Sequence, residues 1–228
     1  MISSYFTADH HKLIIYQLFV RLFGNKKESV KPFGTIEENG CGKFNDITDL
    51  ALQELAAFGI SHVWLTGILE HSTVTDYSAY GMKGDSPYLV KGRAGSPYAI
   101  RDYYDVDPDL AVDVNNRMQE FNDLVKRIHS NQLKVIIDFV PNHVARSYHS
   151  DVKPSGVRDL GEDDNTSHFF SVSNNFLYLQ GSEFIIPGDY HPLGGDESVG
   201  NRNDYREAPA RVTGNDIYSA SPSSNDWF

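Results

Sequence analysis

The stretch of sequence that decides the fold reads Leu133-Lys134-Val135-Ile136-Ile137-Asp138-Phe139-Val140-Pro141-Asn142-His143. It begins as a nearly continuous apolar run, which is typical of a strand buried on both faces of a parallel sheet. An acid, an amide and an imidazole follow where this strand would end. Parallel α/β folds collect their functional residues at the carboxyl ends of strands. The stretch therefore predicts a buried strand that leads into a functional site.

Upstream, apolar patterning predicts two more strands with a helix between them. Leu13–Val20 is a continuous apolar run, and His62–Thr66 is a shorter one. Between them, Asn45 can cap a helix and Gly59 can end it, because glycine adopts the left-handed conformation at low cost. The apolar positions of this helix recur at spacings of three and four, so they share one face: Ile47, Ala51, Leu55 and Phe58.

A second helix is predicted before the third strand. Asp113 can cap it, and Asn131 can take the left-handed position that ends it. Its apolar stripe consists of Val114, Met118, Phe121, Val125 and Ile128. The segment from Glu70 to Pro108 is rich in Gly, Tyr, Ser and Pro, and is predicted to be a long functional loop. The order of strands and helices implies parallel strands joined by right-handed crossovers.

The patterning breaks down after His143. Residues 144–228 are rich in Asn, Asp, Ser, Gly, Pro and aromatic residues, with short candidate strands at Phe176–Leu179 and Phe184–Ile186. We interpret this part as an irregular subdomain inserted after the third strand. The sequence thus predicts two units, residues 1–143 and residues 144–228.

Composition sets the class of protein. The 228 residues include 31 acidic residues against 20 lysines and arginines, a net charge of −11, and 40% of them are hydrophobic. This is an ordinary soluble globular composition. The acidic excess argues against a nucleic-acid partner, because phosphate backbones attract basic faces.

The sequence offers no sign of membrane insertion or export. It contains no apolar run of about 18 residues, so no membrane span is expected. The run Leu13–Val20 lacks a basic segment before it and a cleavage site after it, so we predict no signal peptide and a cytoplasmic location. A parent protein whose signal had been removed would instead be periplasmic or secreted. The single cysteine, Cys41, is predicted to be a small structural residue and not a catalytic thiol.

The strand-end stretch resembles the first conserved motif of the α-amylase family, glycoside hydrolase family 13, in which Asp, three residues, Asn and His close the third barrel strand. Ile15–Phe23 resembles the opening strand of that family. Phe44–Ile47 and Leu55–Gly59 resemble the two ends of its first helix, and Val63–Thr66 its second strand. The segment that resembles its aromatic loop is Tyr98–Pro108. Ordered matches over about 130 residues are more specific than one motif.

The resemblance implies an α/β fold, a (β/α)8 TIM barrel of which the first three strands are present, with an irregular inserted domain B. It implies that Tyr98 stacks on the sugar ring and that His143 binds the primary hydroxyl of the sugar. Asp138 would help to position the catalytic carboxylates, whereas Asp102 and Tyr103 would hold the aromatic loop together. From the residues alone, Tyr98 reads as packing and Asp138 as a structural acid.

The resemblance also implies calcium, because Asn142 is the position that binds this ion in many members. The stretch Thr213–Asp216 falls in a comparable region, where Asp216 would be a second ligand. The alternatives are that Asn142 bonds the backbone of its own turn and that Thr213–Asp216 is a plain turn. No organic cofactor is expected.

Three positions depart from the family pattern. The chain has Gly67 where the family has proline after the second strand, and Pro97 where it has glycine before the aromatic residue. Ala99 stands where many exo-acting α-glucosidases have an aspartate, which favours endo-acting or transferring members.

The function implied is that of a retaining glycoside hydrolase acting on starch or maltodextrin-type α-glucosidic bonds, with an α-glucan or oligosaccharide as its partner. The alternatives are a transglycosylase or phosphorylase of the same family, or a non-catalytic carbohydrate-binding or partner domain. We recognise no catalytic residue in this chain, since the family's nucleophile and acid/base would lie beyond Phe228. We therefore expect an amino-terminal fragment that is inactive alone and associates through an exposed barrel edge.

Overall fold

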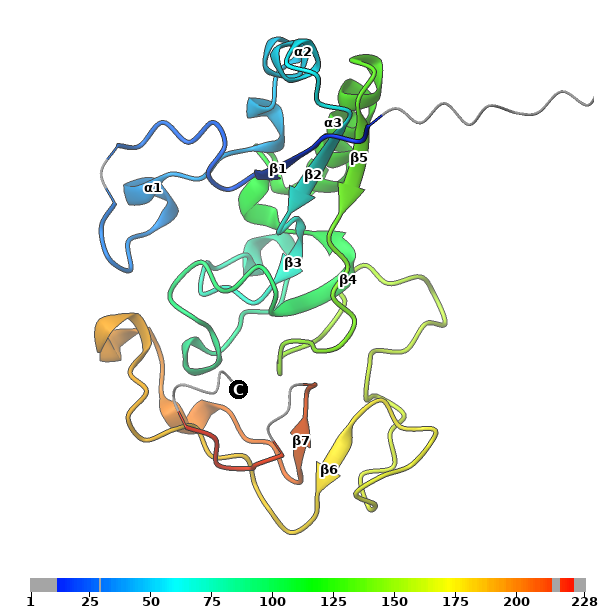
Figure 1. Cartoon of the computed structure of the whole chain (residues 1–228). Helices are drawn as coiled ribbons and strands as arrows, with labels where there is room; N and C mark the ends of the chain where they lie inside the picture. The colour runs from blue at the N-terminus through cyan, green and yellow to red at the C-terminus, as the bar shows by residue number, and fades with distance from the viewer. Residues whose placement is uncertain (1–11, 29, 215–217, 224–228) are drawn as a thin grey trace, which may run out of the picture.

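A computed structural model of the chain describes residues 12–28, 30–214 and 218–223. Its central element is a parallel sheet of three strands in the order β1 (Ile15–Phe19), β2 (His62–Thr66) and β5 (Lys134–Ile137). The register places Gln17 beside Trp64 and Trp64 beside Ile136 (Figure 1). The parallel βαβ arrangement predicted from the apolar runs is confirmed.

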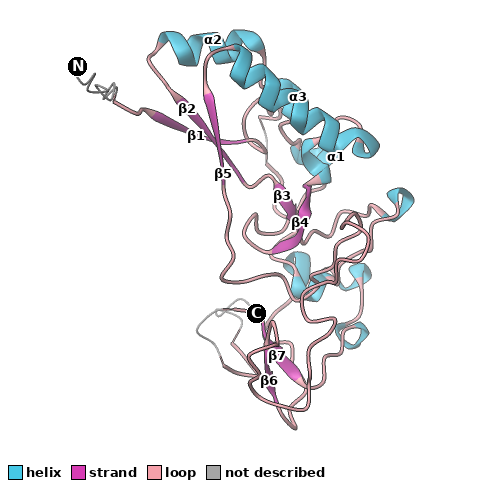
Figure 2. Ribbon diagram, turned by 90° about the vertical axis from the view of Figure 1, so that its right-hand side faces the viewer, coloured by secondary structure: helices cyan, strands magenta, loops and turns pink. Residues whose placement is uncertain are grey.

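Two α-helices cover one face of this sheet, α2 (Asp49–Ala57) and α3 (Arg117–Ser130) (Figure 2). A short helix, α1 (Ile36–Asn39), lies in the loop after β1. The remaining helical elements are single 3-10 turns at Phe44–Asp46, Ser78–Tyr80, Pro87–Leu89, Pro108–Leu110, Val114–Asn116, Pro192–Gly194, Glu197–Val199 and Arg202–Asp204. Within the described ranges, no helix combines the length and hydropathy that crossing a membrane requires.

The helix boundaries differ from the prediction at both starts. Thr48, not Asn45, caps α2, because its hydroxyl accepts the Ala51 N–H at 3.3 Å. Asn45 lies in the preceding 3-10 turn. Asp113 accepts the Asn115 N–H at 3.0 Å and so caps the 3-10 turn that leads into α3.

Of the two helix ends, one agrees with the prediction and the other does not. Gly59 follows α2 with a φ of 94°, as predicted. After α3, Gln132 takes the left-handed position with a φ of 61°, whereas Asn131 has a φ of −91°. The Asn131 side chain instead donates to Asp49 Oδ1 at 2.8 Å, so it links the ends of the two helices.

The hydrophobic core lies between the sheet and the two helices. Its buried members come from alternate positions along the strands, from the turn before α2 and from the inner faces of α2 and α3: Leu18, Val20, Val63, Leu65, Phe44, Ile47, Leu52, Leu124 and Ile128. On α3, Leu124 is buried although it is not part of the predicted apolar stripe. Met118, which is part of that stripe, is 38% exposed. The opposite face of the sheet is uncovered, with Ile15 51% exposed and Ile136, the register partner of Trp64, only half-buried.

The predicted loop from Glu70 to Pro108 is partly a β-hairpin. β3 (Leu69–His71) pairs antiparallel with β4 (Ile100–Val106). The prediction failed because Arg101, Asp102 and Asp105 are buried. A strand with charged residues inside does not show the alternation that identifies strands.

The part after His143 holds a second small antiparallel pair, β6 (Leu177–Leu179) and β7 (Ala210–Val212). The candidate strand at Phe184–Ile186 is wrong. The N–H groups of Phe184 and Ile185 donate to two different segments, at Glu207 and Ala220, and so form no ladder.

This part packs on the long loop before β4. Tyr88 and Leu89 form one buried cluster with Phe184, Ile186 and Ala210. The Tyr190 hydroxyl donates to the Val90 carbonyl at 2.5 Å. Two insertions far apart in the sequence therefore share one small core below the sheet.

Candidate functional site

Polar side chains line the sheet face that the helices leave uncovered. Asp138 follows β5 directly, and its Oδ1 accepts a hydrogen bond from Trp64 Nε1 on β2. On the same face, Gln17 Nε2 of β1 donates to Thr66 Oγ1 at 2.9 Å. Asp138 Oδ2 is buried and has no hydrogen-bond partner within the described part of the chain. The predicted site acid therefore stands at the strand ends, held by a neighbouring strand.

Asn142 orients the ring of His143. Nδ1 of His143 lies 2.9 Å from Oδ1 of Asn142. An amide oxygen only accepts, so this contact selects the tautomer that carries its proton on Nδ1, in which Nε2 is an acceptor. His143 is half-buried. This arrangement suits a hydrogen bond from a hydroxyl group of a ligand to Nε2.

Tyr103 on β4 supports the backbone of this turn. Its hydroxyl lies 2.6 Å from the carbonyl oxygen of Val140 and 3.2 Å from that of His143. Its ring centroid is 5.5 Å from Phe139 and 5.8 Å from Tyr148. Burial raises the pKa of Tyr103, so the hydroxyl keeps the proton that it donates. The β3–β4 hairpin thus fixes the position of His143.

The stretch Thr213–Gly214 lies directly against Asn142. The Val144 N–H donates to the Thr213 carbonyl at 3.0 Å. A Cβ atom at Gly214, which has a φ of 108°, would lie 2.1 Å from the Asn142 carbonyl oxygen. The chain segment suggested as a source of metal ligands therefore reaches Asn142. Asp216 itself lies outside the described residues, and both metal assignments stay predictions.

Tyr98 is held near the ends of β1 and β2. It is 40% exposed. Pro97 before it packs so closely on Gly67 that a Cβ atom at Gly67 would lie 2.7 Å from Pro97 Cβ and 2.9 Å from Phe19 Cε2. The two departures from the family pattern are thus neighbours, because the proline ring occupies the space that a side chain at position 67 would need.

Asp102 lies apart from these residues, inside the hairpin. It is fully buried on β4, directly opposite Glu70 on β3. Burial raises the pKa of Asp102. Glu70 in turn accepts a hydrogen bond from Arg101 Nη1 at 2.6 Å. Neither Glu70 nor Arg101 is predicted from the sequence as a site residue, although the closely spaced charges at positions 101, 102 and 105 were a signal.

We expect Glu70 to make stability depend on pH. Burial, which Arg101 offsets only in part, raises its pKa from 4.5 to about 8. Between these values the folded chain holds a proton that the unfolded chain has lost, so stability falls as pH rises through this window. Glu70→Gln should remove that part of the slope in urea unfolding measured with a chelator present.

Glu54→Gln, at an exposed position of α2, is the matched control and should keep the wild-type slope. If Glu70→Gln retained that slope as well, Glu70 would not be the group that titrates.

Cys41 carries no catalytic chemistry. It is buried, and burial raises the pKa of its thiol to about 11. The thiol is therefore protonated near neutral pH and is a poor nucleophile.

Comparison with known proteins finds one family. Residues 23–180 match the family described as alpha amylase, catalytic domain. The cyclomaltodextrin glucanotransferase of Bacillus sp. (strain 1011) is 28% identical over 144 residues, which cover 58% of this chain and 18% of that protein. The human amino acid transporter heavy chain SLC3A1 is 30% identical over 131 residues, 58% of this chain and 14% of that protein.

Another relative is the trehalose-6-phosphate hydrolase of Bacillus subtilis (strain 168), 28% identical over 137 residues, which cover 60% of this chain and 18% of that protein. Among solved structures, an alpha-amylase from Lactobacillus plantarum is 28% identical, with a TM-score of 0.41 over 59% of this chain and 24% of that one. The chain thus spans less than a fifth of the length of these curated relatives.

Proposed function

Because the chain belongs to the alpha-amylase family, we propose that it forms the first part of the catalytic barrel of an enzyme that cleaves α-glucosidic bonds of starch or maltodextrins by a retaining mechanism. The observation that supports this most is the Asn142–His143 pair at the end of β5, with Nε2 of His143 left to accept from a hydroxyl. Whether the glucosyl group passes to water or to a second sugar depends on parts outside the described residues.

The uncovered face of the sheet fits this proposal. In a closed (β/α)8 barrel, the inner faces of the strands enclose an interior that is filled by layers of side chains from all the strands. Ile15 and the half-buried Ile136 are apolar residues of that face, and Gln17, Thr66 and Asp138 are polar ones. The further strands of the parent would cover the apolar residues and leave Asp138 at the barrel mouth. Alone, the chain would associate through this face and edge.

The chain's own residues would bind and orient the sugar. The aromatic face of Tyr98 matches the C–H face of a pyranose ring, and the exposed position of the side chain leaves that face available. His143 would hold one hydroxyl group and so fix the rotation of the ring. Retaining hydrolysis also needs two carboxylates about 5 Å apart across the bond, which the rest of the parent would supply.

Calcium at Asn142 is part of the proposal, but the described residues do not make a complete site there. Asn142 offers one side-chain oxygen, which already accepts from His143. Calcium takes six to eight oxygen ligands. Further oxygens would have to come from beyond Gly214, so we derive no step of the reaction from this ion.

A second candidate is a partner domain without catalytic activity, because one relative is a transporter heavy chain. Such a domain would have no use for an exposed Tyr98 or for a His143 held with Nε2 free. We therefore favour the enzyme. The presence of the nucleophile and acid/base carboxylates in the parent would separate the two.

Binding of maltoheptaose to the purified chain, measured by calorimetry, tests the sugar site. We expect weak binding, and we expect Tyr98→Ala and His143→Ala each to reduce it by about fivefold, since stacking and one directed hydrogen bond each contribute about 1 kcal/mol.

Tyr80→Ala is the matched control, because Tyr80 is a comparably exposed tyrosine of the same loop, 45% against 40% for Tyr98. It should bind like wild type. Equal affinity of all variants would overturn the assignment of the site, and activity of the parent on a substrate other than an α-glucan would overturn the proposed reaction.

A further inference from the structure

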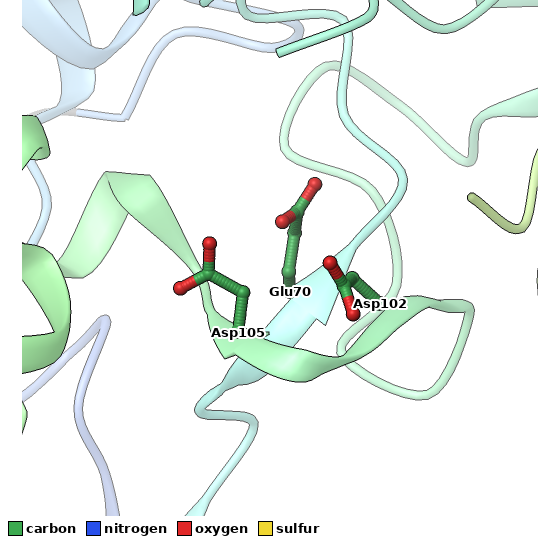
Figure 3. A group of neighbouring side chains, drawn as sticks. All are labelled: Glu70, Asp102 and Asp105. Carbon is green, nitrogen blue, oxygen red and sulfur yellow. The ribbon is translucent and has the colours of Figure 1, made fainter. Parts of the chain in front are cut away.

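Three buried carboxylates meet inside the β3–β4 hairpin, away from the sugar site. Glu70 of β3 and Asp102 and Asp105 of β4 each place a carboxylate oxygen within 4.8 Å of the other two. All three side chains are at most 2% exposed. Figure 3 shows them on the same side of the hairpin, with Glu70 between the two aspartates.

The strand pairing brings these like charges together. Glu70 and Asp102 are register partners, and the register shifts between Leu69 and Glu70, where one residue step on β3 spans four on β4. This irregularity brings Asp105 to the same side as Asp102. Like charges directly opposite each other destabilise an antiparallel pair. Three carboxylates buried together therefore need a compensating positive charge, and where no cation supplies it Glu70 holds a proton instead.

Two arginines, Arg101 of β4 and Arg117 at the start of α3, compensate only in part. Arg117 binds Asp105, with Nε 2.8 Å from Oδ2. Arg101 binds Glu70 at 2.6 Å but also lies 3.5 Å from both Asp85 and Asp151. Two guanidinium groups therefore contact four carboxylates, and Asp102 adds a fifth, all on side chains at most 15% exposed. Lys83 lines a small cavity together with Glu70 and Asp85. Even when its positive charge is added to those of the two arginines, the carboxylates outnumber the cations.

One carboxylate oxygen of Glu70 indicates that the cluster could bind a cation. Oε1 of Glu70 is bonded to Arg101, but Oε2 is buried and has no hydrogen-bond partner among the residues that the structure describes. A buried carboxylate oxygen without a donor is costly. Ser150, buried and next to Asp102, offers a further oxygen.

We propose that Glu70, Asp102 and Asp105 bind a divalent cation, calcium in preference to magnesium. Oxygen-only ligands suit both ions. Magnesium requires near-ideal octahedral geometry and keeps several of its waters, whereas calcium accepts irregular sets of oxygen ligands, so three buried carboxylates suit calcium better. The hairpin is joined to the segment after His143 by the His149 N–H, which donates to Arg101 O at 3.0 Å. An ion bound next to this hydrogen bond would strengthen the junction. This site does not depend on the sugar site or on Asn142.

Thermal unfolding of the purified chain, first treated with a chelator and then titrated with calcium or magnesium chloride, tests the proposal. At about 100 times Kd, calcium should raise Tm by roughly 5 °C or more, and magnesium should raise it less. Terbium luminescence excited through tyrosine should saturate at one ion per chain and reverse with calcium.

Asp102→Asn is the decisive variant, because the amide still accepts the Tyr104 N–H, which lies 2.7 Å from Oδ1. Without metal it should unfold at or above the wild-type Tm, since one like charge is gone, and calcium should no longer shift it. Asp196→Asn, at an exposed acid, and Asn142→Ala should both keep the full shift.

Two outcomes would overturn the site. In the first, calcium leaves wild-type Tm and terbium luminescence unchanged, which would mean that the carboxylates share a proton instead. In the second, calcium shifts Asp102→Asn as much as wild type, which would mean that the ion binds elsewhere.

Discussion

Replacing Arg21 by methionine should destabilise the chain by about 3–5 kcal/mol, because it leaves buried charge without its partner. Arg21 Nη2 lies 2.6 Å from Asp109 Oδ2 and 3.8 Å from Asp107 Oδ1, and both aspartates are fully buried. Methionine retains the apolar stem of the side chain, so the loss reports the charge. The free energy of unfolding in urea near neutral pH measures it.

The pH dependence of this loss identifies its source. His71 Nδ1 lies 2.8 Å from Asp107 Oδ2, and this pair keeps the pKa of His71 raised and that of Asp107 lowered. Asp107 therefore retains a positive partner after the substitution. The Asp109 carboxylate would keep the hydrogen bond from Tyr77, with Lys43 at its backbone carbonyl, and burial already raises its pKa. The cost of Arg21→Met should thus shrink as pH falls, because Asp109 takes up a proton at a higher pH than an exposed aspartate does.

Arg158→Met is the matched control. Arg158 makes an ion pair of the same length with Glu162, 2.6 Å, but its side chain is 63% exposed. Exposed pairs contribute about 0–1 kcal/mol, so this variant should unfold close to wild type. If the two substitutions cost the same, burial of Asp107 and Asp109 is not what makes Arg21 important.

Phe44→Ala should cost about 3–5 kcal/mol through the cavity that it leaves. Phe44 is completely buried, and its ring centroid lies 5.6 Å from that of Phe121 on α3. The Phe44 carbonyl also accepts from Arg127 Nη2 at 2.8 Å, so the backbone of the turn stays attached to α3 and cannot easily collapse into the space.

Phe58→Ala provides the comparison, since this phenylalanine at the end of α2 is 84% exposed. A surface substitution of this kind changes stability by about 0.5 kcal/mol or less. A similar loss for both variants would show that the space between the sheet and α3 is not the main core of the chain.

The parallel strands could be predicted because they are rich in apolar residues. Leu13–Val20 is interrupted only at Gln17, and Leu133–Val140 only at Lys134 and Asp138. Helix ends were less predictable, because several residues near each end could act as the cap. Thr48 and Asn45 could each cap α2. Thr48 does so because the burial of Phe44 holds Asn45 in the preceding 3-10 turn.

The hairpin could not be predicted from local pattern. Its buried residues are charged, and they are compensated by partners far away in the sequence, such as Glu70 with Arg101 and Asp105 with Arg117. Periodicity reports only apolar burial. The same limit applies to the site. His143 and Asn142 stand out by their motif, whereas the contact with Gly214 depends on a chain reversal that local sequence does not encode.

The shared core of the two insertions sets an order for events at the ribosome. Val90 bonds to Tyr190, 100 residues later. At about 5–20 residues per second, translation delivers the second partner on the order of 5–20 s after the first. During that interval the nascent loop carries Tyr88 and Leu89 without Phe184 and Ile186 to cover them. A nascent chain arrested before residue 184 would therefore leave Tyr88 and Leu89 uncovered for as long as the arrest lasts.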